Sequence, residues 1–228
     1  MDSMPLRKFE WNNYEEELNR IGPTPRHIRR ILKRYLERIE FDSIVDVGCG
    51  TGSFLESLNL EGKRVAGIDI STEAIKTCRD KFGKKWQFDV FDIESASPEK
   101  KYDVAVCSDT LEHIKNDVKA LKNIRKLCSR LIISVPAGKY MEDDRLVGHY
   151  RRYSKRELIS KLRKAGFSIH KAEYWGFPFY SPIYRSIINR VKVNEKVNFM
   201  TRILAELIYF SFFLNIKDRG DRIFVLAE

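Results

Sequence analysis

The chain has 228 residues, of which 43% are hydrophobic and 12% aromatic, enough to bury the core of one compact domain. Its formal charge of +10 favours anionic partners, although much of this charge also fits the solvated faces of helices. The cysteines form no CxxC pair and have no histidines at zinc-ligand spacing, which excludes a disulfide scaffold or a zinc ribbon. We therefore predict a cytoplasmic protein without a signal peptide or a bound metal. The four cysteines are Cys49, Cys78, Cys107 and Cys128.

The first predicted element is an amphipathic helix over residues 25–39, with Pro25 at its start. Its apolar side chains recur three and four residues apart, so one face should be buried. These side chains are Ile28, Ile31, Leu32, Tyr35, Leu36 and Ile39.

From residue 43 onwards, short apolar runs alternate with helical segments. The runs are SIVDVG, RVAGIDI, WQFDVFDI, YDVAVCS and LIISVP. Ser71 and Ser154 are predicted helix caps, the latter with Glu157 in a capping box. A helix stop is predicted at Gly166. The sixth and seventh predicted strands are SIHKAEYW and RIFVLAE. This alternation predicts an α/β fold, a Rossmann-like, seven-stranded, mostly parallel sheet with helices on both faces.

A long segment separates the last two predicted strands and favours an insertion rather than a hairpin. It ends in ILAELIYFSFFLNI, too short and too charged to span a membrane. A helical cap packed on the domain is favoured, with an interfacial membrane helix as the alternative. The predicted organisation is an N-terminal helical extension (1–40), a cofactor-binding core (41–176), a helical cap (177–216) and the last core strand (217–228).

The most informative motif is IVDVGCGTGSF, residues 44–54. An apolar strand ends in an acid, Asp46, and three glycines then open a helix. Glycine allows a sharp turn and a close approach of the backbone to a ligand. Ser53 stands where the dinucleotide-binding GxGxxG motif needs its third glycine, which disfavours a nicotinamide-dependent oxidoreductase.

DVGCGTGSF resembles the cofactor loop of class I S-adenosylmethionine-dependent methyltransferases. The resemblance covers roughly residues 40–175 and implies that Asp46, Gly48, Gly50 and Gly52 hold the methionine part of S-adenosylmethionine. That part is a zwitterion, so it needs N–H donors for its carboxylate and an acceptor for its ammonium group.

Two further acids match the order of this family. Asp69 ends the second predicted strand, 17 residues after Gly52, and the resemblance implies that it binds the ribose, with Ile70 touching the adenine. Asp92 and Ile93 follow on the third predicted strand and would contact the adenine. Asp89 is the competing acid.

The segment YDVAVCSDTLEHI resembles the fourth strand of the family and the loop after it. This places Cys107 and Ser108 near the cofactor, and Asp109, Glu112 and His113 near the site of transfer. Helix capping is the alternative role for the two acids.

A GHYRRY-like loop after the fifth predicted strand resembles one subgroup of small-molecule methyltransferases, associated with polysaccharide and sugar pathways. The predicted catalytic residues are His113, His149 and Tyr150. The two histidines are chosen because imidazole accepts a proton near neutral pH. Arg151 and Arg152 could bind an anionic acceptor. Alternatively, they fasten the loop by pairing with Glu142, Asp143 and Asp144.

These motifs together predict a methyltransferase that uses S-adenosylmethionine to methylate an N or O atom of a small molecule. A sugar, a sugar nucleotide or a lipid-linked precursor is the candidate acceptor, and peripheral membrane contact is allowed. A nucleic-acid methyltransferase fits the charge, but CSDT stands where amino-directed DNA enzymes have N/D-P-P-Y. A non-catalytic cofactor-binding or membrane-associated adaptor is the remaining alternative. The sequence leaves the oligomeric state open.

Overall fold

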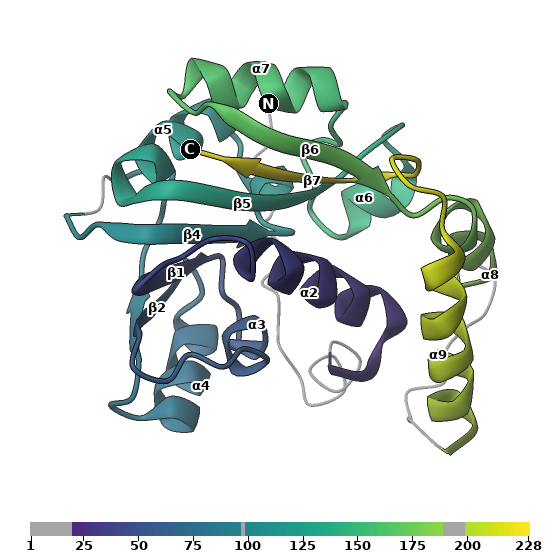
Figure 1. Cartoon of the computed structure of the whole chain (residues 1–228), viewed down its shortest axis with the longest axis horizontal. Helices are drawn as coiled ribbons and strands as arrows, with labels where there is room; N and C mark the ends of the chain where they lie inside the picture. The colour runs from purple at the N-terminus through teal and green to yellow at the C-terminus, as the bar shows by residue number, and fades with distance from the viewer. Residues whose placement is uncertain (1–19, 97–98, 189–198) are drawn as a thin grey trace.

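The computed structural model describes residues 20–96, 99–188 and 199–228. Its centre is a seven-stranded sheet in the order β3-β2-β1-β4-β5-β7-β6 (Figure 1). Every neighbouring pair is parallel except those made by β7, which runs antiparallel to β5 and β6. This confirms the predicted Rossmann-like, mostly parallel sheet. The strands are β1 (Ser43–Val47), β2 (Arg64–Asp69), β3 (Gln87–Val90), β4 (Tyr102–Ser108), β5 (Cys128–Pro136), β6 (Ile169–Trp175) and β7 (Arg222–Ala227).

Helices cover both faces of the sheet, as predicted for parallel strands. One face packs against α2 (Pro23–Leu36), α3 (Ser53–Glu56) and α4 (Thr72–Phe82). The other packs against α5 (Asp117–Leu127) and α7 (Lys155–Lys164). Successive side chains of the central strands enter the two cores alternately, so Val45 lies in one core and Ile44 in the other.

Element boundaries differ slightly from the sequence prediction. The first described long helix begins at Pro23 rather than Pro25, because proline suits the first helical position, where no N–H partner is needed. The third strand ends at Val90, so Asp92 lies in the following loop. The predicted caps are confirmed: the Ser71 hydroxyl accepts from Ala74 N and that of Ser154 from Glu157 N, each at 3.2 Å.

The segment between β6 and β7 is helical where it is described. It contains the irregular turn η2 (Phe179–Tyr184), α8 (Arg185–Ile188), α9 (Phe199–Ser211) and the short turn η3 (Phe212–Leu214). Because β7 is antiparallel, this segment leaves and re-enters the sheet at the carboxyl edge of the parallel strands. Figure 1 shows α9 at one end of the molecule, and it packs on α2.

No helix among the described residues is long and apolar enough to cross a membrane. The predicted division into extension, core and cap remains a prediction, and residues 1–19 of the extension and 189–198 of the cap lie outside the described residues.

Candidate active site

The glycine loop follows β1 at the carboxyl edge. Gly48, Gly50 and Gly52 have φ angles of +76°, +51° and +77°. A side chain at these angles is strained, so the loop conformation requires glycine. The turn brings the backbone of the loop to the edge where open α/β sheets bind ligands. The N–H groups of Gly48 and Gly52 donate to the carbonyls of Ile68 and Cys49.

Asp69 ties this loop to the end of β2. Its Oδ2 accepts from Gly50 N at 2.9 Å, and its Oδ1 accepts from Ser71 N at 2.8 Å. Ile70, which lies between Asp69 and Ser71 in the chain, exposes 65% of its surface. The acid predicted for ribose and the residue predicted for adenine thus lie directly beside the glycine loop.

Asp46 lies on β1 beneath the loop and is almost completely buried. Burial, and secondarily the negative charge of Asp69, raises the pKa of Asp46 to about 7. The structure therefore brings Asp46, Gly50 and Asp69 together, and a cationic group bound here would stabilise the ionised form of Asp46.

The carboxylate of Asp92 is turned toward its own loop. It accepts from Glu94 N at 2.9 Å and from the Ser95 hydroxyl. Ile93 is buried, and its carbonyl accepts from the side-chain amide of Asn123 at 2.8 Å. In this conformation Asp92 satisfies local donors rather than facing an open site.

The loop after β4 is fastened to β7. Asp109 has a positive φ of 52° and forms an ion pair with Arg222. Burial lowers the pKa of Arg222 to about 9. Cys107 is completely buried, whereas Ser108 is partly exposed. Asp109 thus has a partner in β7, a role that its position in the sequence did not predict.

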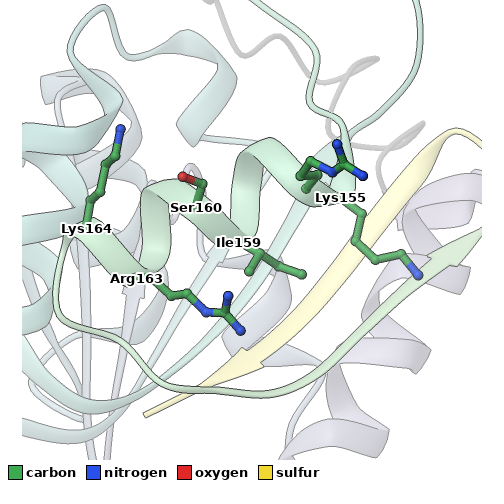
Figure 2. Close-up of a pocket in the computed structure, with 6 residues that line it drawn as sticks. Lys155, Ile159, Ser160, Arg163 and Lys164 are labelled. Atoms are coloured by element: carbon green, nitrogen blue, oxygen red, sulfur yellow. The ribbon is translucent and has the colours of Figure 1, made fainter.

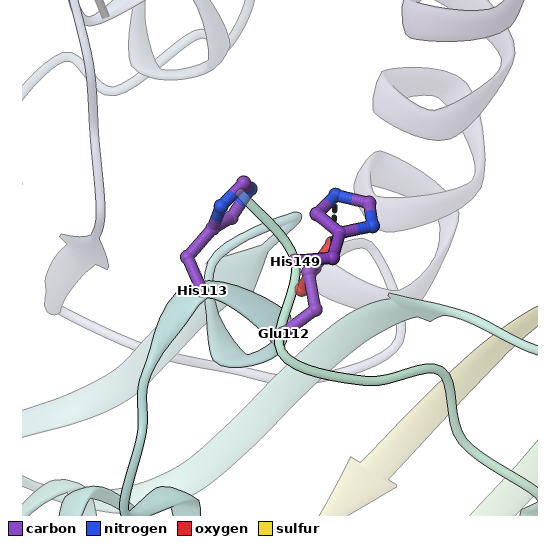
Figure 3. Close-up of side chains that lie close together, drawn as sticks. All are labelled: Glu112, His113 and His149. Carbon is purple, nitrogen blue, oxygen red and sulfur yellow. Dashed lines mark ion pairs between the residues drawn. The ribbon is translucent and has the colours of Figure 1, made fainter. Parts of the chain in front are cut away.

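Two predicted catalytic histidines meet at the site (Figure 3). The rings of His113 and His149 lie edge to face with centroids 4.6 Å apart, and Glu112 Oε1 is 4.0 Å from His149 Nε2. Burial lowers the pKa of His113 to about 4 and raises that of Glu112 to about 8. Both histidine rings are therefore predominantly neutral near pH 7, since burial also lowers the pKa of His149.

Glu112 is a functional candidate that the sequence could not separate from a helix cap. Its side chain is fully buried, and neither carboxylate oxygen accepts a hydrogen bond from another described residue. Each of three residues, Glu112, His113 and His149, offers one ligand atom, and these atoms lie within 4.8 Å of one another. The three residues could therefore hold a divalent cation. The absence of a metal remains a prediction.

A chain of alternating charges connects His149 to the helical insertion. His149 Nδ1 lies 2.9 Å from Asp144 Oδ1, and Arg152 Nε donates to Asp144 Oδ2 at 2.6 Å. Asp221 Oδ2 lies 3.8 Å from an Arg152 nitrogen and accepts from Arg185 Nη1 at 2.5 Å. Asp144 orients the imidazole, and sequence reasoning had considered it only as an arginine partner. No sequence signal indicated Asp221 or Arg185.

The two arginines of the GHYRRY-like loop have internal partners. Arg152 pairs with Asp144, as the loop-fastening interpretation expects, while Arg151 pairs with Asp117 at 2.7 Å. The Tyr153 hydroxyl also donates to Asp117, at 2.9 Å. Tyr150 is 41% exposed, and its N–H donates to the Glu112 carbonyl at 2.8 Å. The arginines therefore stabilise the loop that carries His149 and Tyr150.

Two surface hollows lie near this loop and along α7, and the first is lined by Asp117 and Arg151 among others. One of about 710 Å³ lies along α7, and Figure 2 shows the basic side chains around it. None of the predicted site residues lines it. Its lining consists of Lys155, Arg156, Ile159, Ser160, Arg163 and Lys164.

Comparisons with known proteins indicate the family to which the chain belongs. A family model described as a methyltransferase domain matches residues 16–172. The ubiquinone biosynthesis O-methyltransferase of Nitrosomonas europaea is 29% identical over 147 residues, 58% of this chain and 59% of that protein. The chain thus spans less than two thirds of that relative.

Solved structures share the fold at low sequence identity. The N-methyltransferase NodS of Bradyrhizobium japonicum, in complex with S-adenosyl-L-homocysteine, has a TM-score of 0.61 and 16% identity, covering 95% of this chain and 92% of that one. The [4+2]-cyclase SpnF has a TM-score of 0.63 and 18% identity, covering 90% and 82%. The family match, supported by the shared sheet, confirms the resemblance drawn from the glycine loop: the chain belongs to the methyltransferase-domain family, with the class I fold of S-adenosylmethionine-dependent methyltransferases.

Proposed function

We propose that this protein is a methyltransferase that transfers a methyl group from S-adenosylmethionine to an oxygen or nitrogen atom of a small-molecule acceptor. The observation that carries the proposal is the contact of Asp69 with Gly50 at the carboxyl edge, directly above the buried Asp46. It joins the acid expected to bind ribose to the loop expected to hold the methionine part.

The residues fit the chemistry of this cofactor. Asp46 offers a carboxylate for the ammonium group. The N–H groups of Gly48, Gly50 and Gly52 donate within the protein, so the loop contributes the close backbone approach that its glycines allow. Asp69 accepts from ribose hydroxyls, and the exposed Ile70 supplies an apolar surface for the adenine.

The contacts of the remaining predicted residues are less direct. Asp92 would have to exchange its bond to Ser95 for the adenine amino group. Ile93 and Cys107 are buried, so they shape the floor of the site, with Ser108 at its rim.

Bound S-adenosylmethionine supplies a methyl group already activated by its sulfonium, so positioning the acceptor contributes much of the rate. His149 is the proposed general base for an acceptor hydroxyl. Asp144 fixes its Nδ1 side, which leaves Nε2 facing Glu112 and the ring of His113 nearby. Tyr150 is proposed to contact the acceptor from the same loop.

The acceptor itself is proposed by class. The name of the Nitrosomonas relative supports an oxygen atom of a small molecule, and that of NodS a nitrogen atom. A sugar, a sugar nucleotide or a lipid-linked precursor fits the GHYRRY-like loop. The internal pairing of Arg151 and Arg152 weakens the case that these two residues bind an anionic group. We place the protein in the cytoplasm, consistent with four buried free cysteines.

Calorimetric titration with S-adenosylmethionine and with NAD tests the cofactor assignment. Micromolar binding of the first supports the proposal, whereas binding of NAD alone overturns it. A screen of sugar nucleotides, lipid precursors and small amines with methyl-labelled cofactor then identifies the acceptor. Repeating the assay with a chelator, and then with added zinc or magnesium, determines whether Glu112, His113 and His149 act as metal ligands or in proton transfer.

A second candidate function follows from the structural likeness to SpnF. A cyclase on the same sheet means that the fold alone does not establish methyl transfer. Binding of S-adenosylmethionine without methylation of any acceptor in the screen would favour this candidate or a non-catalytic cofactor-binding adaptor.

A further inference from the structure

The outer surface of α9 is apolar. We define the apolar face of α9 as six side chains along this helix and η3, with exposed fractions between 40% and 68%. They recur at helical spacing on one side, so they form a continuous stripe rather than scattered exposed residues. The six are Met200, Ile203, Leu204, Leu207, Phe210 and Leu214.

Contacts with α2 fix the orientation of this helix. Glu206, at the border of this face, pairs with Arg26 at 2.6 Å, and the Tyr209 carbonyl lies 2.8 Å from His27 Nε2. Phe212 is buried against the rings of His27 and Trp175. Turning the apolar face inwards would break these contacts, so the stripe is held outwards by the tertiary structure.

Helix α7 of the same chain has the opposite pattern. Its apolar residues Leu158 and Leu162 are fully buried, while Arg156, Arg163 and Lys164 face solvent. This is the ordinary pattern of an amphipathic helix whose outer side faces only solvent. Helix α9 differs in that its outer side also carries apolar side chains, which favours an apolar partner for that side.

Positive charge borders this face. Helix α2, PTPRHIRRILKRYL, contains five arginines and lysines and no acid, and it packs on α9. The Arg26 guanidinium lies 4.0 Å from the Tyr209 ring centroid, and that of Arg30 lies 4.3 Å from the Phe213 ring centroid. The one acid of α9, Glu206, is neutralised by Arg26. Cations beside an exposed apolar stripe match the two components of an anionic lipid surface.

We propose that the apolar face of α9, together with the cations of α2, docks the protein onto anionic membranes, with α9 lying in the lipid interface. This proposal stands on the two helices alone and does not require the proposed enzymatic activity. Docking through the insertion would bring the carboxyl edge of the sheet, where the insertion begins and ends, close to the lipid.

Vesicle co-sedimentation of the full chain tests the proposal, with vesicles of phosphatidylcholine alone and of phosphatidylcholine mixed with phosphatidylglycerol. We expect binding to the mixed vesicles and a partition coefficient at least about tenfold lower for the double variant Leu204→Gln/Leu207→Gln, which removes exposed apolar area. Because both side chains are exposed, the variant should fold, which its circular dichroism and its affinity for S-adenosylmethionine verify.

Matched variants separate the apolar and ionic contributions. Lys33→Gln/Arg34→Gln removes two exposed cations from α2 and should weaken binding to the mixed vesicles. The remaining binding should also depend less on salt. Arg163→Gln/Lys164→Gln removes two exposed cations from α7 and should leave binding unchanged.

Two results would overturn the proposal. One is the absence of vesicle binding by the unmodified chain at low salt. The other is a dimer in light scattering that Leu204→Gln/Leu207→Gln dissociates, with no vesicle binding, which would assign the face to a second copy of the chain.

Discussion

The Asp69 carboxylate accepts a hydrogen bond from the Gly50 N–H at 2.9 Å, so the end of β2 directly supports the loop that follows β1. In the sequence these residues are two separate motifs with separate expected roles. In the fold, Asp69 shapes the loop, and we propose that it also binds the ribose, so a substitution there would remove both roles together.

Asp69→Ala should therefore reduce the affinity for S-adenosylmethionine by about tenfold to a hundredfold, because ribose hydroxyls and the Gly50 N–H both lose an acceptor. Calorimetry measures the affinity and thermal unfolding measures the stability. Asp80→Ala, which removes an exposed acid from α4, is the control and should change neither. An unaltered affinity in Asp69→Ala would remove this residue from the cofactor site.

Gly50→Val should abolish cofactor binding, since φ is +51° and the side chain would lie at the approach of the methionine part. Gly62→Val is the matched control: Gly62 has a φ of +74°, and a Cβ there meets nothing within 4 Å. Both variants carry a backbone cost of about 1–2 kcal/mol. Binding lost equally in both would attribute the effect to strain rather than to the site.

Cofactor binding should release a proton at acidic pH. Burial raises the pKa of Asp46 to about 7, so the free protein holds a proton there below that pH, whereas a bound ammonium group favours the carboxylate. Affinity should rise with pH up to about 7 and then level off. Calorimetry in two buffers of different ionisation enthalpy measures the proton release, which Asp46→Asn should eliminate. A release unchanged in that variant would place the titrating group elsewhere.

His149→Gln should lower kcat by about 10²- to 10⁴-fold for a hydroxyl acceptor, with cofactor affinity retained, if this residue is the base. Burial lowers the pKa of His149 below 6.5, despite the opposing effect of Asp144. The imidazole is thus neutral at pH 7, and kcat should fall only as the pH decreases below 6.5. The control is His170→Gln, an exposed histidine at the amino end of β6. An acid limb that persists in His149→Gln would assign the base to another group.

Arg185→Gln should impair turnover without weakening cofactor binding. Its guanidinium holds Asp221, which in turn lies near Arg152 and so supports the Asp144–His149 pair. We expect kcat to fall several-fold while the affinity for S-adenosylmethionine stays constant. Arg185→Lys should partly restore kcat. Equal kcat in the unmodified protein and Arg185→Gln would mean that the insertion does not position His149.

The sequence by itself determined the sheet and its cofactor edge. Strand–helix alternation and the glycines of residues 44–54 impose local backbone conformations, and an acid directly after a parallel strand must lie at the carboxyl edge. The order of the strands was enough to place Asp46, Gly50 and Asp69 at this edge, whereas their proposed cofactor roles came from the resemblance to the methyltransferase family and stay predictions.

The tertiary structure decided which polar groups are engaged and which surfaces are left open. Asp221 beside Arg185 and Arg222 beside Asp109 meet only when β7 returns antiparallel to the carboxyl edge. Asp144 meets His149 through the conformation of the loop after β5. The direction of the apolar face of α9 likewise depends on its packing against α2. Periodicity identifies an apolar stripe on a helix, but only the contacts on the opposite side of that helix determine whether the stripe faces the core or the solvent.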